Sequence, residues 1–254
     1  MTEASPFTED AFLGGQLRLR QPQSGHRAGH DAMLLAAATP ARPGDRVVDF
    51  GAGVGAAGLA VARRVAGIEL VLVEIDEALA RLAHGNADLN AIAADVVVLD
   101  VTSDAAAFAA AGLGPDSVDV VLMNPPFNDS ARHRASPDKA RASAHVATPA
   151  TLESWIHAGR RILKSGGALS LIWRADGIAE VLATLGRGFG SLMIVPVHAD
   201  AATPAIRLLI RAVKGGKAPT QMQAALMLND ESAVPNKQLQ DILAGKGVLP
   251  LAVP

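Results

Sequence analysis

The residues best suited to chemistry are four consecutive ones, Asn124-Pro125-Pro126-Phe127, which follow a short apolar run over residues 118–123. That run, Val-Asp-Val-Val-Leu-Met, is typical of a buried strand in a parallel sheet. The two prolines end the strand because neither has a backbone N–H to donate, and they hold the preceding residue in an extended conformation. We therefore expect Asn124 at the carboxyl end of a central strand, where open α/β sheets bind ligands.

The side-chain oxygen of Asn124 and the carbonyl of Pro125 can each accept a hydrogen bond. Together they can hold both N–H groups of a planar amine or amide, which leaves the nitrogen lone pair turned outward as a nucleophile. Phe127 adds a flat apolar face on which a base can stack. Asn-Pro and Pro-Pro also punctuate ordinary loops, so these residues alone do not decide between a catalytic site and a turn.

A glycine-rich loop lies upstream, at Gly51-Ala52-Gly53-Val54-Gly55. It follows a short expected strand and precedes an expected helix, so its backbone can approach a nucleotide closely. The same residues loosely satisfy the dinucleotide pattern of nicotinamide enzymes. However, Asp49 would oppose a pyrophosphate and favours a cationic ligand, such as an ammonium or sulfonium group. S-adenosylmethionine carries both groups, so the loop favours this cofactor over NAD.

Acidic residues follow two further strands of the expected sheet. Glu74 ends one strand and suits ribose hydroxyls, and Asp100 ends the next and can accept a hydrogen bond from an adenine amino group. Each has an ordinary alternative, since Glu74 can be a solvated strand end and Asp100 can cap the turn that follows it. Because Asp49, Glu74, Asp100 and Asn124 end consecutive strands, their joint placement favours a binding site.

Strands and helices alternate from residue 46 onward, which predicts an α/β fold with a Rossmann-like, doubly wound sheet of seven mostly parallel strands. The strands are expected at 46–50, 69–74, 95–100, 118–123, 167–173, 192–197 and 206–211. Asp31 and Asp176 are expected to cap two of the helices. Residues 1–15 are expected to be irregular, within an N-terminal lead over 1–30. A central domain over 31–213 and a C-terminal appendage over 214–254, packed on it, complete the chain.

Composition limits the classes of protein to which the chain can belong. Half of its 254 residues are hydrophobic, and it contains no cysteine, which excludes disulfides and thiolate metal sites. No apolar run is long enough to span a bilayer, and the polar N-terminus is unlike a signal peptide, so we expect a cytoplasmic protein. The net charge of −2 means that any basic surface for a nucleic acid must be local.

These motifs together resemble class I S-adenosylmethionine-dependent methyltransferases of the amino-methylating branch. The resemblance rests on Asp49, the glycine loop, Glu74, Asp100 and the Asn-Pro-Pro-Phe motif, and it covers residues 16–212. It implies a class I methyltransferase fold for the central domain, S-adenosylmethionine as cofactor, no metal, and methylation of an exocyclic or amide nitrogen.

The segment over residues 21–32, Gln-Pro-Gln-Ser-Gly-His-Arg-Ala-Gly-His-Asp-Ala, narrows the resemblance. It is similar to a segment of bacterial tRNA(Val) adenine-N6-methyltransferases that lies over the cofactor, although that family commonly has a small hydroxyl residue at the place of His30. The implied partner is therefore RNA, most specifically tRNA. The same Asn-Pro-Pro motif serves rRNA guanine-N2, DNA adenine-N6 and protein glutamine-N5 methyltransferases. A non-catalytic nucleic-acid-binding module and an NAD-dependent oxidoreductase are further alternatives.

The resemblance and the residue types give three predicted sets. The catalytic set is Asn124, Pro125, Pro126 and Phe127. The cofactor set is Arg27, Gly29, Asp31, Asp49, Gly51, Ala52, Gly53, Gly55, Glu74, Ile75, Asp100, Val101 and Asn124. The substrate set is Phe127 with the basic loop residues Arg132, Arg134, Lys139 and Arg141, which suit RNA phosphates. Arg160, Arg161 and Lys164 fit the exposed face of a helix.

Overall fold

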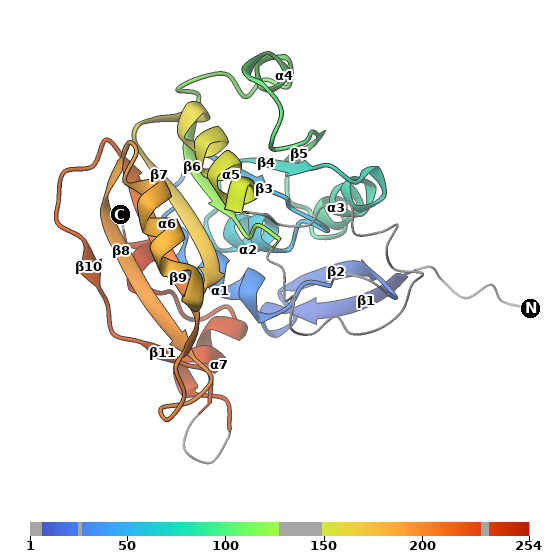
Figure 1. Ribbon diagram of the computed structural model, residues 1–254. Coiled ribbons are helices and arrows are strands. Elements are labelled where there is room, and N and C mark those ends of the chain that lie inside the picture. The colour runs from blue at the N-terminus through green and yellow to red at the C-terminus, as the bar shows by residue number, and fades with distance from the viewer. Residues whose placement is uncertain (1–6, 25–26, 127–148, 230–233, 254) are drawn as a thin grey trace, which may run out of the picture.

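The computed structural model describes residues 7–24, 27–126, 149–229 and 234–253, and its centre is one large sheet (Figure 1). The strand order is β10-β8-β9-β7-β6-β3-β4-β5, and β11 also pairs with β8. The strands are β3 (Arg46–Phe50), β4 (Glu69–Glu74), β5 (Ala94–Val98), β6 (Val118–Met123), β7 (Leu163–Arg174), β8 (Phe189–His198), β9 (Ala205–Lys214), β10 (Gln221–Met222) and β11 (Leu226–Met227). From β5 to β7 all neighbours are parallel, whereas β9 is antiparallel to both β7 and β8. The seven expected strands are all present, and the two short strands from the C-terminal segment extend the edge.

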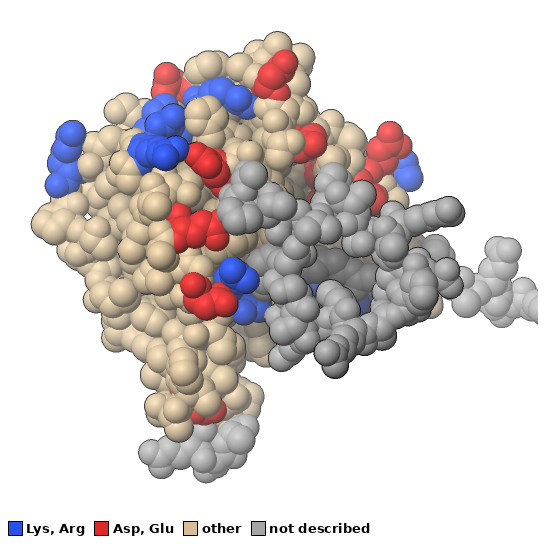
Figure 2. All heavy atoms as spheres, viewed as in Figure 1, with Lys and Arg blue, Asp and Glu red and all other residues tan. Residues whose placement is uncertain are grey.

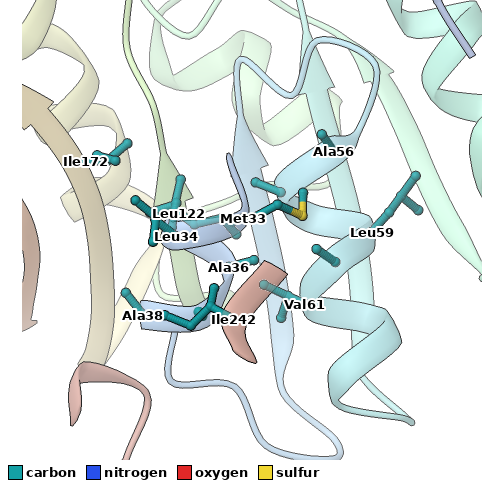
Figure 3. Close-up of a cluster of buried hydrophobic side chains, with 14 of the residues drawn as sticks. Met33, Leu34, Ala36, Ala38, Ala56, Leu59, Val61, Leu122, Ile172 and Ile242 are labelled. Atoms are coloured by element: carbon teal, nitrogen blue, oxygen red, sulfur yellow. The ribbon is translucent and has the colours of Figure 1, made fainter. Parts of the chain in front are cut away.

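Helices cover both faces of the sheet. The first layer holds α1 (His30–Ala38), α2 (Ala56–Arg64) and α3 (Glu77–Leu89), and the second holds α4 (Ala105–Ala110), α5 (Pro149–Ile162) and α6 (Ile178–Leu185). Alternate strand residues enter opposite cores, as the two-residue period of a strand requires. Val47 lies in the core that contains α1 and α2, while Val48 and Phe50 lie in the core that contains α4 and α5, where Phe50 contacts Phe108. Figure 3 shows the first core, where Leu34 of α1 lies beside Leu122 of β6 and Met33 points towards α2.

The N-terminal segment forms a hairpin of β1 (Phe7–Phe12) and β2 (Leu17–Pro22), joined by the short 3-10 helix η1 (Leu13–Gly15). The expectation that residues 1–15 are irregular is therefore wrong for Phe7–Phe12. The polar run Thr-Glu-Asp interrupts the apolar pattern of this strand, which forms because it pairs along its whole length with β2.

Two side-chain amides on α3 hold the free edge of the hairpin. Asn86 Oδ1 accepts from the backbone N–H of Arg20 at 2.7 Å, and its Nδ2 donates to the Arg20 carbonyl at 3.0 Å. One turn later, Asn90 makes the same two bonds with Arg18, at 2.9 and 2.7 Å. Each side-chain amide thus makes the two hydrogen bonds that a backbone residue of a neighbouring strand would make with β2. Asn86 Nδ2 also donates to the Val54 carbonyl at 3.0 Å, which joins the hairpin to the glycine loop.

The C-terminal segment closes against α1. Its helix α7 (Lys237–Leu243) and its final 3-10 turn η4 (Pro250–Ala252) bury Ile242 and Leu251 in the core that contains α1. The backbone N–H of Leu249 also donates to the Ala37 carbonyl at 2.9 Å.

Two expected helix caps are wrong. Asp31 lies in the first turn of α1, whose N-cap is Gly29. Asp176 lies in the 3-10 turn η3 (Ala175–Gly177), and Gly177 is the N-cap of α6. In both places a backbone turn begins earlier than the side-chain pattern indicates. Among the described residues, no helix combines the length and the apolar character needed to cross a bilayer.

Replacing Asn86 with Ala removes the partners of Arg20 N–H, the Arg20 carbonyl and the Val54 carbonyl. Since each unsatisfied buried polar group costs about 1–3 kcal/mol, we expect the free energy of unfolding to fall by at least about 2 kcal/mol in a urea titration. The control is His84→Ala on the same helix, whose side chain is 65% exposed and which should change stability by about 0.5 kcal/mol or less. Equal stabilities for the two variants would contradict the role given to Asn86.

Candidate active site

The carboxyl ends of three central strands lie level with one another. Phe50, the last residue of β3, pairs with Val73 of β4 on one side and Met123 of β6 on the other. The glycine loop, Glu74 and Asn124 therefore leave the sheet side by side. The structure brings together the central residues of the predicted site.

Two features of the structure require glycine at the first position of the loop: the backbone conformation and the lack of room for a side chain. Gly51 has a φ of +64°, which side chains other than glycine rarely adopt. A Cβ at this position would also lie 2.4 Å from Cη2 of Trp155. Trp155 is a buried residue of α5, so its indole packs directly beneath the loop. The sequence analysis did not identify Trp155, because nothing in the pattern of α5 distinguishes it from other core residues.

Glu74 braces the glycine loop. Its Oε2 accepts from the backbone N–H of Gly53 at 2.7 Å, and its Oε1 accepts from Ile75 and Asp76 N–H at 2.8 and 2.9 Å. The residue is 6% exposed. A carboxylate has about four lone-pair positions, so these three bonds leave room for one hydroxyl donor such as a ribose.

Asp49 is a carboxylate without a cation. It is 3% exposed, and its Oδ2 accepts from the backbone N–H of Gly58 in α2 at 2.8 Å. Burial raises its pKa from 3.8 to about 7; the hydrogen bond from Gly58 opposes this rise, and the nearby Glu74 adds to it. No ion pair involves Asp49 within the described part of the chain. A positively charged ligand would therefore favour its ionised form, whereas a pyrophosphate would not.

Asp100 caps the turn that follows it, which is the alternative to binding an adenine. Its Oδ1 accepts from both the backbone N–H and the hydroxyl of Thr102, at 2.7 and 2.8 Å, and so caps the turn after β5. Its neighbour Val101 is buried, and Ile75, after β4, is 41% exposed. Contact between these residues and an adenine stays a prediction.

Two predicted cofactor residues at the start of α1 form ion pairs within the protein. Arg27 pairs with Asp10 of the hairpin at 2.6 Å and donates to the Pro22 carbonyl at 2.8 Å. Asp31 pairs with Arg207 of β9 at 3.0 Å. Together with Gly29 at the N-cap, these contacts fix the start of α1. A direct role for Arg27, Gly29 or Asp31 in holding the cofactor stays a prediction.

Asn124 presents an acceptor that lacks a donor. Its Oδ1 is buried and has no hydrogen-bond partner among the described residues. Pro125 beside it is buried and Pro126 is exposed. A buried amide oxygen left unpaired costs about 1–3 kcal/mol, so this atom is suited to a donor that arrives with a ligand. Phe127 and the predicted substrate residues Arg132, Arg134, Lys139 and Arg141 lie outside the described residues.

Residues 24–199 match the family model of the methyltransferase small domain. The chain belongs to this family. It is an S-adenosylmethionine-dependent methyltransferase with the class I fold, as the sequence resemblance implied. The residues present suit that cofactor, because the buried Asp49 has no positive partner in the described part of the chain and Glu74 retains acceptor capacity for a ribose hydroxyl.

Two curated proteins are similar to this chain. One, from Serratia proteamaculans, is named tRNA1(Val) (adenine(37)-N6)-methyltransferase and is 28% identical over 210 residues, which cover 81% of this chain and 78% of that protein. The other, from Dickeya chrysanthemi, has the same name and is 28% identical over 193 residues, which cover 75% and 74% of the two chains.

Solved structures show the same fold. A protein from Agrobacterium tumefaciens, described as a predicted O-methyltransferase, is 33% identical, with a TM-score of 0.73 over 86% of this chain and 98% of that one. A 16S rRNA N2 methyltransferase from Thermus thermophilus, solved with S-adenosylmethionine and guanosine, is 20% identical, with a TM-score of 0.56. The alignment with it covers 82% of this chain and 50% of that chain.

The raised pKa of Asp49 predicts pH-dependent cofactor binding. As the pH falls below about 7, protonation removes the negative charge that favours a cation, so calorimetry should show the affinity for S-adenosylmethionine decreasing. Asp49→Asn keeps an acceptor for Gly58 but cannot ionise. At pH 8 it should bind at least roughly tenfold more weakly, the equivalent of about 1.4 kcal/mol, with little dependence on pH. Equal pH profiles for the two proteins would remove Asp49 from the cofactor site.

The same pKa predicts a change in stability. Because the folded pKa lies above the unfolded value, the folded protein retains a proton that the unfolded chain loses between pH 4 and 7. The contribution of Asp49 to stability is therefore lost as the pH rises through this window, by up to about 4 kcal/mol for a shift of about three units. Urea titrations should show Asp49→Asn gaining stability relative to the wild type from pH 4 to pH 8. A constant difference would contradict the raised pKa.

Proposed function

We propose that this methyltransferase acts on the N6 amino group of an adenine in tRNA. The observation that carries the proposal is the buried Oδ1 of Asn124, which has no partner among the described residues and lies beside Pro125, level with the glycine loop. The names of the curated relatives support the choice of base and of RNA. A tRNA substrate also agrees with the expected cytoplasmic location.

The two acceptors distinguish an amine from a hydroxyl. An exocyclic amino group has two N–H donors, and Asn124 Oδ1 and the Pro125 carbonyl can accept one each. A hydroxyl has a single proton and would leave one acceptor without a partner. Nitrogen is therefore the better target, although the similar Agrobacterium tumefaciens structure is described as a predicted O-methyltransferase.

The residues of the chain act by holding and orienting groups. Asp49 supplies negative charge for the cationic end of the cofactor, and Glu74 holds both the loop and a ribose hydroxyl. Asn124 and Pro125 accept the two amine protons and so direct the nitrogen lone pair away from them. S-adenosylmethionine, when bound, supplies a methyl group made electrophilic by the sulfonium. Orientation of the amine contributes much of the rate, and the product loses its extra proton to water.

The predicted basic loop, with Arg132, Arg134, Lys139 and Arg141, is part of the same proposal. Its four cations follow the catalytic motif directly in the sequence, and phosphate binding by such residues is strongly salt-dependent. Phe127 would stack on the target base.

Methyl transfer from labelled S-adenosylmethionine to tRNA, rRNA, DNA and a release-factor protein tests the substrate class. We expect label in tRNA, recovered as N6-methyladenosine after digestion to nucleosides. Recovery as N2-methylguanosine in rRNA, or as methylglutamine in the protein, would keep the chemistry and replace the substrate. Label in none of the four would contradict the proposal.

Asn124→Ala tests the catalytic role. Loss of one positioned acceptor should lower turnover roughly a hundredfold or more, while calorimetry should find the affinity for S-adenosylmethionine nearly unchanged. Asn124→Asp retains acceptor oxygens at the same position and should be more active than the Ala variant. Turnover of the Ala variant within a few-fold of wild type would show that Asn124 does not hold the amine.

A further inference from the structure

A groove runs along the outer side of α5. Its first part lies between α5 and the turn after β5, where Val101 and Ser103 face His157 and Arg161. Its second part lies at the end of α5, where Arg160 and Arg161 meet Lys214 at the end of β9. His157 and Arg161 line both parts, and the two adjacent hollows together are called here the α5 groove.

Two arginines in the α5 groove have no carboxylate partner among the described residues. Arg160 donates to the Arg187 carbonyl and contacts Nδ1 of His157 at 3.4 Å. Arg161 donates to the Ser103 carbonyl at 3.2 Å, and its guanidinium lies 4.6 Å from the ring centre of Phe108. Both arginines are therefore held by neutral groups, which leaves their charges without a counter-ion in this part of the protein.

The charges around the α5 groove add to a local positive excess. Three further cations form ion pairs, Lys164 with Asp119 at 2.7 Å, Arg187 with Glu153 at 2.8 Å and Lys214 with Asp116 at 2.8 Å. These three pairs are each neutral, so Arg160 and Arg161 add two charges to them, in a chain whose net charge is −2. Asp100 and Asp104 flank the lining residues 101–103, and both accept hydrogen bonds from the backbone of their own turns. Figure 2 shows Lys and Arg side chains gathered at the upper left, where Figure 1 places α5 and the neighbouring strand ends.

The α5 groove begins next to the cofactor site. Val101 directly follows Asp100, and Trp155 of α5 packs against Gly51 of the glycine loop. Arg161 lies six residues beyond Trp155, which is about 9 Å along a helix that rises 1.5 Å per residue. Because α5 returns from the carboxyl end of β6 to the amino end of β7, the far part of the groove lies towards the opposite edge of the sheet from Asn124. A substrate bound at Asn124 must therefore extend well beyond one nucleotide to contact it.

The lining favours a phosphate backbone over bases. Its described residues are mainly Ser, Thr, His, Arg and Lys, with glycine at 188 and 215, and include no Phe, Tyr or Trp. The one carboxylate among them, Glu153, is paired with Arg187. Single-stranded bases bind chiefly by stacking on aromatic rings, whereas phosphates take charge-assisted hydrogen bonds from arginine. The stacking of Arg161 on Phe108 also fixes its guanidinium before binding, which reduces the entropy lost.

We propose that the α5 groove binds the phosphodiester backbone of the RNA substrate, away from the nucleotide that is methylated. The identity of the partner as RNA rests on the proposed function, and the location rests on the charges and shape of the groove. Because the groove contacts backbone phosphates, it contributes affinity and orientation but does not distinguish one RNA sequence from another.

The test is filter binding of purified tRNA at several salt concentrations by the wild type and by the double variant Arg160→Gln/Arg161→Gln. Each lost phosphate contact lowers the slope of log affinity against log salt by about 0.7–0.9, so the double variant should have a slope smaller by about 1.5. The affinity for S-adenosylmethionine should not change. Equal slopes would overturn the proposal.

Two controls separate charge from structure. Arg160→Lys/Arg161→Lys keeps both charges and should retain most of the wild-type slope; loss of slope in this variant too would mean that the arginines act only on the fold, and would overturn the proposal. Arg81→Gln/Lys237→Gln removes two cations whose side chains are 73% and 86% exposed on α3 and α7. It should have the wild-type slope, and a slope as small as that of the groove variant would show that net charge alone is responsible.

The result is independent of the catalytic proposal. If tRNA is methylated but the slopes are equal, the α5 groove is not the contact and the proposed function stands. If no RNA accepts a methyl group but the slope depends on the two arginines, the groove binds RNA and the proposed substrate is wrong. If polyglutamate binds the wild type but not the Arg160→Gln/Arg161→Gln variant, and tRNA binds neither, the partner is an acidic protein and the groove proposal is wrong.

Discussion

The register of β4, β3 and β6 is the constraint on which the site depends. Val73, Phe50 and Met123 are level across these strands, so Glu74, the glycine loop and Asn124 begin at one edge. A slip of β6 by one residue would exchange its two faces, moving Val120 and Leu122 out of one core and Val121 and Met123 out of the other. The cost of repacking both cores therefore fixes the position of Asn124, which belongs to neither core.

Three side chains then hold the loop between β3 and α2 and the first turn of α2. Asp49 accepts from Gly58, Glu74 accepts from Gly53, and Asn86 donates to Val54. Each belongs to a different element, so the loop is tied to β3, β4 and α3 at once. Asn86 extends this network to the N-terminal hairpin. The glycine loop and the hairpin are therefore parts of one polar framework, although they are far apart in the sequence.

The sequence predicted those parts of the site that depend on strand ends. Asp49, Glu74 and Asn124 each follow an apolar run, and a parallel sheet places such ends together. Contacts between distant side chains could not be predicted in this way. Asp31 and Arg207 are 176 positions apart, and nothing local indicates that they pair. Asn86 was missed because asparagine within a helix has no distinctive spacing. The strand Phe7–Phe12 was missed because its polar centre hides the alternation.

The contact between Trp155 and Gly51 also gives the protein an optical property. The chain contains two tryptophans and no tyrosine, so its near-ultraviolet emission comes from two indoles alone. One of them, Trp155, lies against the glycine loop, with no side chain between the ring and the backbone. The other, Trp173, is a buried residue of β7. Intrinsic fluorescence therefore includes the signal of an indole that lies against the glycine loop, without an added dye.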